Sequence, residues 1–281
     1  METKADATDF LGRFREIVSD PLNLLIKRHP LAGMIDKDLV YLHNGNKVPL
    51  RGQYSYYENF SDILVINRGV HEPLEEYVFQ ELMNVLPDNS SMLELGAYWG
   101  HYSMWLKKIH PKASVYLVEP NEVNIQAGKY NFQLNNCVGE FIQEYVACGQ
   151  FEVDKFMMNN GLKTLSILHS DIQGFEIEML DGSSDTLKKG LIHYAFISTH
   201  SQDIHVKVVE KLEYFGYRVE VASGFDYETT SYDGFVFASN FARPPLFDYF
   251  KPFIRKQIPF SDPLETVVEL TKIINARNIK T

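Results

Sequence analysis

The sequence predicts an α/β fold in which a mostly parallel sheet is covered by helices on both faces. Three observations lead to this prediction. Between residues 91 and 240, short apolar runs alternate with helix-length amphipathic segments. One apolar run passes through Gly96 and Gly100 directly into a helix. The last two runs, 218–222 and 234–238, are close enough along the chain to pair antiparallel, so a hairpin is expected to end the sheet.

The chain divides into three parts around this sheet. Residues 1–70 are expected to form an N-terminal extension with a helix and a β-rich segment. The helix carries Phe10, Phe14 and Ile17 on one face, and a hairpin follows around Asn44-Gly45. Residues 71–240 form the α/β domain. Residues 241–281 form a helical tail, whose helix is expected to begin after Asp262 as N-cap.

The individual elements follow from apolar spacing and from glycine and proline positions. A strand is expected at 62–67 in the extension, and a helix beginning at Glu72 precedes the sheet. Strands of the domain are expected at 92–96, 114–119, 140–147, 164–171 and 193–199. Helices are expected at 101–109, 121–134, 174–188 and 203–215.

The composition limits the classes of partner. Acidic side chains outnumber basic ones by 37 to 27, and the net charge is −10. This balance argues against a nucleic-acid partner, because phosphate binding needs a basic face. The two cysteines, Cys137 and Cys148, have neither metal-ligand nor disulfide-framework spacing, so free thiols are expected. No signal peptide or membrane-spanning stretch is apparent, and a cytoplasmic protein is expected.

The glycine segment has the sequence Leu93-Glu94-Leu95-Gly96-Ala97-Tyr98-Trp99-Gly100, an E-x-G-x-x-x-G pattern. A strand that enters a helix through a glycine turn points backbone N–H groups at a ligand and lets that ligand approach closely. A dinucleotide-binding fold carries G-x-G-x-x-G instead, because a pyrophosphate must rest on the helix N-terminus. Bulky Tyr98 and Trp99 stand where that loop needs open backbone, which argues against a nicotinamide-dependent oxidoreductase.

Polar side chains follow three of the predicted strands. Glu119 ends the run 114–119 and is placed to accept hydrogen bonds from the hydroxyls of a ribose. Asp171 ends the fourth strand, just before the turn at Gly174, and His200 follows the fifth strand. Ligands of open parallel sheets bind outside the carboxyl ends of the strands. We therefore expect Asp171 and His200 to converge in one crevice.

These segments together resemble the class I S-adenosylmethionine-dependent methyltransferases. The glycine loop is similar to motif I of that superfamily, and the order of elements resembles its Rossmann-like seven-stranded sheet ending in an antiparallel hairpin. Within the superfamily, residues 62–240 resemble the FkbM family. That family carries D-[VI]-E-G-x-E after its fourth strand, where this chain has Asp171-Ile-Gln173-Gly-Phe-Glu176. His200 matches the end of the family's E-x-H-like fifth strand, with Ser198 in place of Glu, and the segment 68–73 resembles the approach to the family's first core strand.

The resemblance implies transfer of a methyl group from S-adenosylmethionine to a hydroxyl oxygen, with a saccharide or glycoconjugate as the expected acceptor. Glu119 is expected to hold the ribose of the cofactor, while the backbone at Gly96 and Tyr98 meets its methionine end. Glu94 is expected to accept a hydrogen bond from the cofactor's ammonium group or from the loop. Gly100, Ser103 and Asp171 complete the expected cofactor-binding set, although Ser103 better suits a bond within the first turn of its helix.

The expected catalytic residues are His200 and Asp171. His200 is the preferred general base, because an unperturbed imidazole titrates near neutrality. Asp171 has three open roles: it orients that imidazole, acts as the base itself, or binds a divalent metal. The need for a metal is left open. His169 lies on the same side of its strand as Asp171 but is expected to be a packed histidine.

Several alternatives remain. The closest rival acceptor is a hydroxyl of a polyketide or peptide natural product. A catalytically silent cofactor-binding module also fits, because Gln173 and Ser198 replace carboxylates. A nucleobase-type N-methyltransferase is disfavoured, because the fourth strand lacks [DN]-P-P-[YF]. The tail 241–281 either covers the core or forms a homodimer contact. Two aromatic groups are candidates for stacking on a sugar ring, and packing explains the first of them equally well: Tyr54, Tyr56, Tyr57 and Phe60, and Tyr227 and Tyr232.

Overall fold

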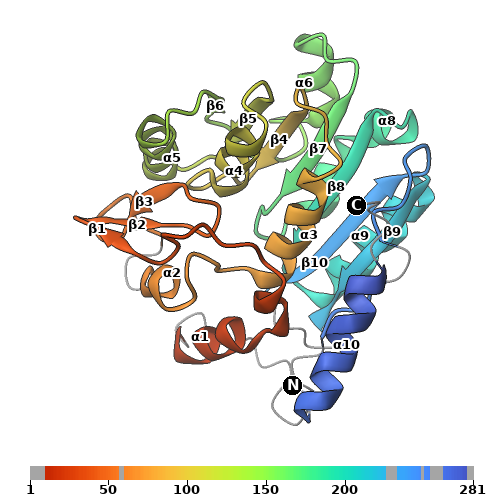
Figure 1. Ribbon diagram of the computed structural model, residues 1–281. Coiled ribbons are helices and arrows are strands. Elements are labelled where there is room, and N and C mark those ends of the chain that lie inside the picture. The colour runs from red at the N-terminus through yellow and green to blue at the C-terminus, as the bar shows by residue number, and fades with distance from the viewer. Residues whose placement is uncertain (1–9, 57–59, 226–232, 248–249, 254–261, 277–281) are drawn as a thin grey trace.

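The computed structural model describes residues 10–56, 60–225, 233–247, 250–253 and 262–276. Its centre is a seven-stranded sheet with the order β6-β5-β4-β7-β8-β10-β9 (Figure 1). The strands of this sheet are β4 (Ser91–Leu95), β5 (Ser114–Val118), β6 (Glu140–Ile142), β7 (Leu165–Ser170), β8 (Ile192–Thr199), β9 (Tyr217–Ser223) and β10 (Gly234–Asn240).

The sheet has the topology expected of a Rossmann-like methyltransferase. Strands β6, β5, β4, β7 and β8 run parallel to one another, whereas β10 runs antiparallel between β8 and β9. The strand order reverses at β4, where β5 lies on one side and β7 on the other. Such a reversal opens a crevice at the carboxyl ends of the central strands. The predicted fold class is therefore confirmed.

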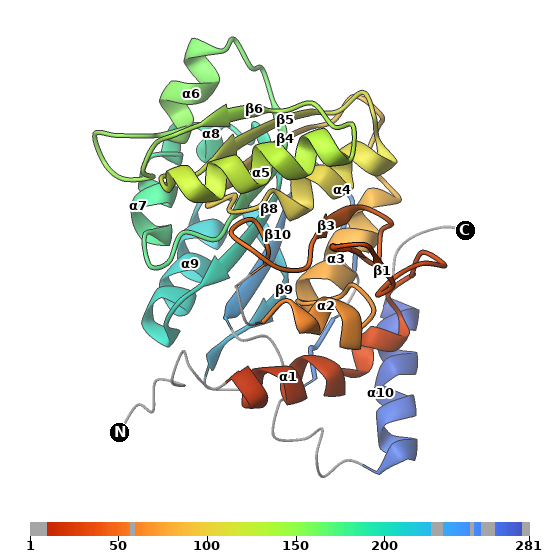
Figure 2. The same ribbon diagram turned by 90° about the vertical axis from the view of Figure 1, so that its left-hand side faces the viewer.

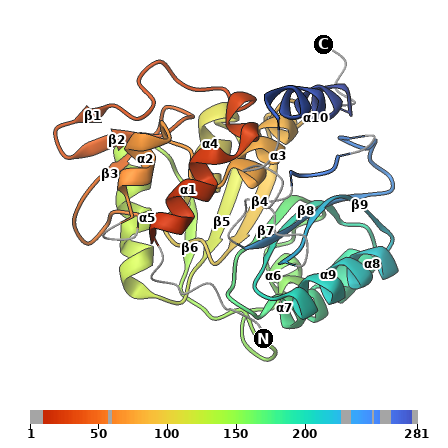
Figure 3. The ribbon, with the colours of Figure 1, turned by 90° about the horizontal axis from the view of Figure 1, so that it is seen from below.

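Helices cover both faces of the sheet. One face carries α3 (Pro73–Met83), α4 (His101–Ile109) and α5 (Glu122–Leu134), and Figure 2 shows α4 and α5 lying across strands β4 and β5. The other face carries α6 (Val153–Asn159), α7 (Glu176–Asp181), α8 (Ser184–Lys188) and α9 (Gln202–Tyr214), which lie on the opposite side from α3 and α4 in Figure 3.

Strand β4 shows how the sequence produces these two layers. Successive side chains of a strand point to opposite faces. Met92 accordingly packs in the core under α3 and α4, while Leu93 and Leu95 pack in the second core under α6 to α9. Glu94 shares the face of Met92, so its carboxylate is carried toward α4. The alternation therefore buries two cores and directs one carboxylate to the start of a helix.

The N-terminal extension consists of α1 (Phe10–Ser19), a 3-10 helix η1 (Pro21–Leu24), α2 (Asp62–Ile66) and a small antiparallel sheet of β1 (Ile35–Asp36), β2 (Leu39–Tyr41) and β3 (Lys47–Pro49). The hairpin predicted around Asn44-Gly45 is confirmed as β2 and β3. It docks on the end of α5 through Asn135, which accepts from the Lys47 amide at 2.7 Å and donates to the Lys47 carbonyl at 2.7 Å.

Three predictions of local structure were wrong. The expected strand at 62–67 is the helix α2, because consecutive Ile63 and Leu64 are both fully buried, a pattern that a strand with one buried face does not give. The expected helix 174–188 is divided into α7 and α8. In α8 the amides of Asp185 and Thr186 donate to the carboxylate of Asp154 on α6, a helix that was not predicted. The expected strand 140–147 ends at Ile142.

The tail contains α10 (Pro263–Ala276), which begins as predicted. Asp262 accepts a hydrogen bond from the Leu264 amide at 2.7 Å, and Glu265 accepts from the Asp262 amide, as in a capping box. Leu270 and Ile273 are buried against the extension, and α10 contacts η1. This part of the tail therefore covers the core. Within the described residues, no helix is both long enough and apolar enough to span a bilayer.

Candidate active site

A cavity of about 810 Å³ opens at the carboxyl ends of β4, β5 and β7. Its walls include Gly96 and Tyr98 from the loop after β4, Glu119 after β5, and Asp171 and Gln173 after β7. A smaller cavity of about 90 Å³ shares Gly96, Tyr98, Asp171 and Gln173 with it. The two cavities therefore adjoin each other at the strand reversal, where the sequence predicted the crevice.

The two glycines of the loop are required for different structural reasons. Gly96 has a φ of +72°, and a Cβ built there would lie 1.8 Å from the carbonyl oxygen of Asp171. No other residue type fits, because the loop after β4 lies directly against the loop after β7. Gly100 has a φ of +77° at the N-terminus of α4, and a Cβ there would lie 2.9 Å from the Phe132 ring. Gly96 shapes the floor of the cavities, whereas Gly100 permits helix packing.

Two residues other than glycine adopt a left-handed backbone conformation in the cavity wall. Tyr98 has a φ of +46° and Gln173 a φ of +53°. Such a conformation costs about 1–3 kcal/mol for a residue other than glycine and persists only where neighbouring contacts impose it. The Tyr98 amide donates to Glu119 Oε2 at 3.0 Å, and the Gln173 side-chain amide donates to Asp171 Oδ1 at 2.8 Å. Strain at two facing loops is typical of a functional site.

Glu119 is placed as predicted, at the end of β5 and in the wall of the larger cavity. Its Oε1 accepts from the Asn121 amide at 2.9 Å and from the Asn124 side chain at 3.2 Å, while Oε2 accepts from the Tyr98 amide. An ionised carboxylate has about four acceptor positions. Three are used within the described residues, so Glu119 retains one acceptor position, on Oε2, for a ligand.

Glu94 connects the sheet to the helix after the loop. It is buried, accepts a hydrogen bond from the Ser103 amide at 3.0 Å, and lines the smaller cavity. Burial raises the pKa of Glu94 to about 7. Among the described residues, neither Gly100 nor Ser103 lines either cavity. The structure therefore brings Glu94, Gly96, Tyr98, Glu119 and Asp171 to the cavities and places the other two in the supporting helix.

Asp171 and His200 converge as predicted. His200 Nε2 lies 3.1 Å from Asp171 Oδ1, and Nδ1 lies 2.6 Å from Oε1 of Glu176, the buried acid at the start of α7. Strands β7 and β8 are parallel neighbours, so their carboxyl ends deliver both residues to one point. The imidazole is thus held between two carboxylates, and its side chain is only 13% exposed.

The protonation of this pair differs from the expectation for an isolated imidazole. Burial lowers the pKa of His200, but the carboxylates of Asp171 and Glu176 outweigh this effect and raise it to about 10. Burial likewise raises the pKa of Asp171, but contact with His200 holds it below its ordinary value. His200 is therefore an imidazolium at neutral pH. It does not begin a reaction as the free base that was expected, and it anchors an ionised Asp171.

Asp233 is a functional candidate that sequence reasoning missed. It precedes β10, lines the smaller cavity, and has its carboxylate 3.9 Å from His200 Nε2. Burial and the negative charge of Asp171 raise the pKa of Asp233 to about 7. A carboxyl group with this pKa exchanges a proton near neutral pH. Its position at the start of the final hairpin strand was the only available signal.

Helix α3 brings further carboxylates that the sequence analysis did not assign. Glu72 lines the smaller cavity and accepts from the Tyr102 hydroxyl at 2.8 Å. Glu75 Oε1 accepts from the Ser198 hydroxyl at 3.0 Å, so a carboxylate contacts the position at which the FkbM family carries Glu. Burial, followed by the charge of Glu72, raises the pKa of Glu75 well above its ordinary value. The residue that caps α3, Glu72, therefore belongs to the wall of the smaller cavity, and Glu75 lies behind it against β8.

Of the aromatic groups proposed for sugar stacking, Tyr54, Tyr56 and Phe60 lie within the described residues. Phe60 is fully buried, and Tyr56 is 3% exposed, with its ring stacked 4.9 Å from Trp99. Both rings belong to the core beneath the extension, and Tyr56 also lines the smaller cavity. Tyr57, Tyr227 and Tyr232 lie outside the described residues. His169 is buried against the Tyr102 ring, as expected of a packed histidine.

Comparison with known proteins gives similarity at the level of the fold. No protein-family model and no curated protein matches the chain. Three solved structures illustrate the similarity. Precorrin-6y C5,15-methyltransferase from Geobacter metallireducens GS-15 has 17% identity and a TM-score of 0.43, covering 59% of this chain and 87% of its own. The ribosomal protein L11 methylase from Lactobacillus delbrueckii subsp. bulgaricus has 10% identity and a TM-score of 0.44, covering 61% and 80%.

The third is M. capricolum TrmK in complex with S-adenosyl-homocysteine, with 14% identity and a TM-score of 0.42, covering 73% of this chain and 88% of its own. At these identities and TM-scores, the fold assignment rests on the strand order and the direction of each strand. The resemblance to the FkbM family stays an expectation from the motifs.

Proposed function

We propose that the chain is an S-adenosylmethionine-dependent methyltransferase that methylates a hydroxyl oxygen. The observation that carries this proposal is the pair of adjoining cavities at the strand reversal. One has the size of a ligand site and a glycine-loop wall, and the other is small and lined by carboxylates. A methyl donor in the first cavity faces an acceptor in the second across Gly96, Tyr98 and Asp171.

The larger cavity suits the proposed cofactor in size and chemistry. Its volume of about 810 Å³ lies within the usual range of small-molecule sites. Glu119 Oε2 offers its remaining acceptor position to a ribose hydroxyl. Glu94 and the backbone between Gly96 and Tyr98 lie near the boundary with the smaller cavity, where they would meet the methionine end. When bound, the cofactor supplies an electrophilic methyl group on a positively charged sulfur.

The residues of the smaller cavity would prepare the acceptor. In an in-line displacement, a new carbon–oxygen bond forms while the carbon–sulfur bond breaks and its electron pair returns to sulfur. The hydroxyl proton must leave as the bond forms, and Asp233 is the group whose pKa, about 7, suits its removal. His200 would hold Asp171 as an anion in the wall that the two cavities share. Correct positioning of the two reactants supplies up to roughly 7–11 kcal/mol of the barrier reduction in favourable cases.

The acceptor class and the family are the finer parts of the proposal. Carboxylates such as Glu72, Asp171 and Asp233 accept hydrogen bonds from neighbouring hydroxyls, which favours a polyhydroxylated acceptor. A saccharide or glycoconjugate is therefore the first class to test, and a polyketide or peptide natural product is the second. The motifs around Asp171 and His200 support membership of the FkbM family, with Gln173 and Ser198 as departures.

The test is transfer of labelled methyl from S-adenosylmethionine into separated pools of saccharides, polyketides and peptides, followed by identification of the methylated atom. We expect a methyl ether in the saccharide pool, and loss of label with Asp233→Asn. Label on nitrogen or carbon would contradict O-methylation. Cofactor binding without label in any pool would instead indicate the silent binding module.

A further inference from the structure

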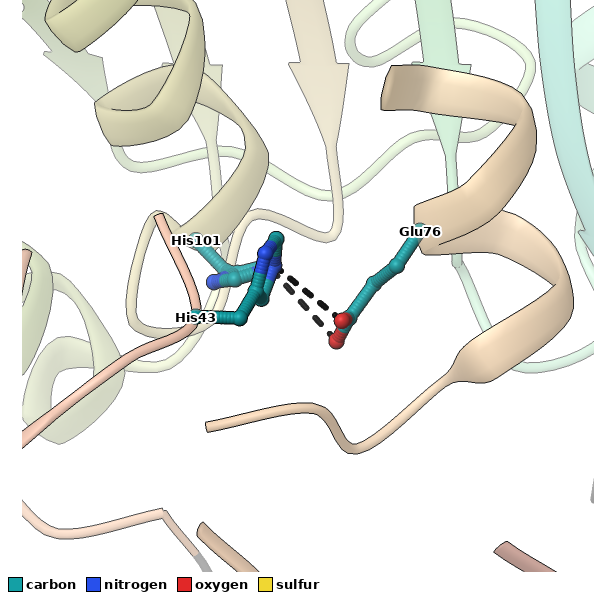
Figure 4. A group of neighbouring side chains, drawn as sticks. All are labelled: His43, Glu76 and His101. Atoms are coloured by element: carbon teal, nitrogen blue, oxygen red, sulfur yellow. Dashed lines mark ion pairs between the residues drawn. The ribbon is translucent and has the colours of Figure 1, made fainter. Parts of the chain in front are cut away.

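We propose that His43, Glu76 and His101 form a binding site for one divalent transition-metal ion of the zinc class, at the edge of the smaller cavity, which His101 lines. The three side chains come from the turn after β2, from α3 and from the first residue of α4. Their ligand atoms all lie within 4.8 Å of one another, and all three residues are buried. Figure 4 shows the two imidazoles approaching the Glu76 carboxylate from the opposite side. The proposal does not depend on the assigned methyl transfer.

The two oxygens of Glu76 are used differently. Oε1 accepts from the His71 amide at 3.0 Å and from the Glu72 amide at 3.3 Å, and it lies 2.7 Å from His71 Nδ1. Oε2 has no hydrogen-bond partner among the described residues. A metal ligand whose other oxygen is fixed by donors is a common arrangement, because such donors orient the carboxylate. Glu76 is therefore held with one oxygen free to coordinate.

Among the described residues, the ring nitrogens of His43 and His101 are also without a hydrogen-bond partner. His43 Nε2 lies 3.1 Å from Glu76 Oε2 but outside hydrogen-bond geometry. Both ring nitrogens of His101 lack a hydrogen-bond partner among the described residues, and Nε2 lies 3.8 Å from Glu76 Oε1. Buried polar atoms are normally paired, so this group requires an explanation. A metal ion would supply the missing partner to all three residues at once.

The spacing agrees with tetrahedral coordination. Ligands bound to zinc at about 2.0–2.1 Å in a tetrahedron lie about 3.3 Å from one another. The 3.1 Å between His43 Nε2 and Glu76 Oε2 is close to this value, and the ligand atoms of all three residues lie within 4.8 Å of one another. His101 also lines the smaller cavity, whose volume of about 90 Å³ has room for a water as a further ligand.

The chemical types of the three side chains also suit a transition-metal cation. Two imidazoles and one carboxylate form a donor set that zinc accepts.

The position of the site suggests its effect. His43 belongs to the extension, while His101 immediately follows Gly100 at the end of the glycine loop. An ion shared by these residues would fasten the extension and α3 to the loop that shapes the cofactor cavity. We therefore expect the ion to stabilise the fold without taking part in methyl transfer.

The experiment uses the metal-stripped, full-length protein. Binding of Zn²⁺ is measured by calorimetric titration, and Co²⁺ is bound in place of Zn²⁺ to record its visible absorption spectrum. We expect about one ion per chain, a ligand-field spectrum of tetrahedral type, and a higher unfolding temperature. Mg²⁺, which prefers oxygen ligands, should compete poorly. Absence of saturable Zn²⁺ binding by the wild-type protein would overturn the proposal, whatever the variants do.

Matched variants locate the site. His43→Gln and His101→Gln should each weaken Zn²⁺ binding by more than roughly 100-fold and remove the Co²⁺ spectrum. His110→Gln is the control, because His110 is also a buried histidine but bonds to the Met83 carbonyl at 3.0 Å, outside the group. Circular dichroism confirms folding of each variant. Equal Zn²⁺ affinity in the wild type and in folded His43→Gln and His101→Gln would also overturn the proposal.

Discussion

Substitution of Gly96 by alanine tests how the glycine loop forms the cofactor cavity. The new Cβ would lie 1.8 Å from the Asp171 carbonyl oxygen, and real Cβ atoms essentially never approach closer than 3.0 Å. The loops after β4 and β7 must therefore separate by about 1.2 Å. A displacement of this size at a site that positions reactants costs roughly 100-fold in rate. We predict losses of that order in both cofactor affinity and methyl transfer.

Gly216→Ala is the matched control for this prediction. Gly216 has a φ of +81°, close to the +72° of Gly96, but a Cβ there meets no atom within 4 Å. Both variants should pay the left-handed backbone penalty of about 1–2 kcal/mol. Only Gly96→Ala should lose affinity for S-adenosylmethionine, measured by calorimetry, beyond any loss of stability in denaturant unfolding. Equal cofactor affinities in the two variants would refute the steric explanation.

Three further predictions concern titration and binding. In the wild type, kcat/KM should rise as pH increases through about 7, where Asp233 loses its proton. Asp233→Asn should remove this rise and lower the rate by about 100- to 10,000-fold. An unchanged rise in the variant would exclude Asp233 as the base. The pKa of His200 is raised to about 10, so its stabilisation is fully present below its ordinary value of 6.5 and is lost as pH increases through about 10. The free energy of unfolding in urea should therefore be about 1–3 kcal/mol higher for the wild type than for His200→Gln at pH 6, and this difference should decrease toward pH 10. A difference that grows with pH would contradict the ion pair. Glu119→Ala should weaken cofactor binding by about 10- to 100-fold through loss of a charged hydrogen bond. Glu122→Ala, at an exposed position three residues later, should bind the cofactor as the wild type does. Equal losses of affinity in the two variants would show that the effect is not specific to Glu119.

The fold and half of the site could be predicted because they depend on local signals. Alternating strands and helices determine a parallel sheet, and the carboxyl ends of adjacent parallel strands lie together. Asp171 and His200 were therefore brought together correctly from strand ends alone. Glu119 was placed correctly for the same reason. The strand predicted at 62–67 failed because a short apolar run has no periodicity that separates a strand from a buried helix.

The remaining site residues could not be predicted because their positions depend on tertiary packing. Asp233 reaches His200 only because β10 inserts between β8 and β9. Glu75 meets Ser198 across 123 residues of chain, where α3 packs against β8. His43 and Glu76 meet because the extension folds back over α3. The raised pKa of His200 depends on burial and on the contact of Glu176 with Nδ1, which the position of His200 at a strand end does not predict.

The most direct test of the central claim is parallel calorimetric titration of the full-length protein with S-adenosylmethionine and with NAD⁺. The glycine-loop geometry and Glu119 predict saturable one-to-one binding of S-adenosylmethionine that weakens in Glu119→Ala, and no binding of NAD⁺. Saturable binding of NAD⁺ without binding of S-adenosylmethionine would contradict the assigned cofactor and, with it, the proposed methyl transfer.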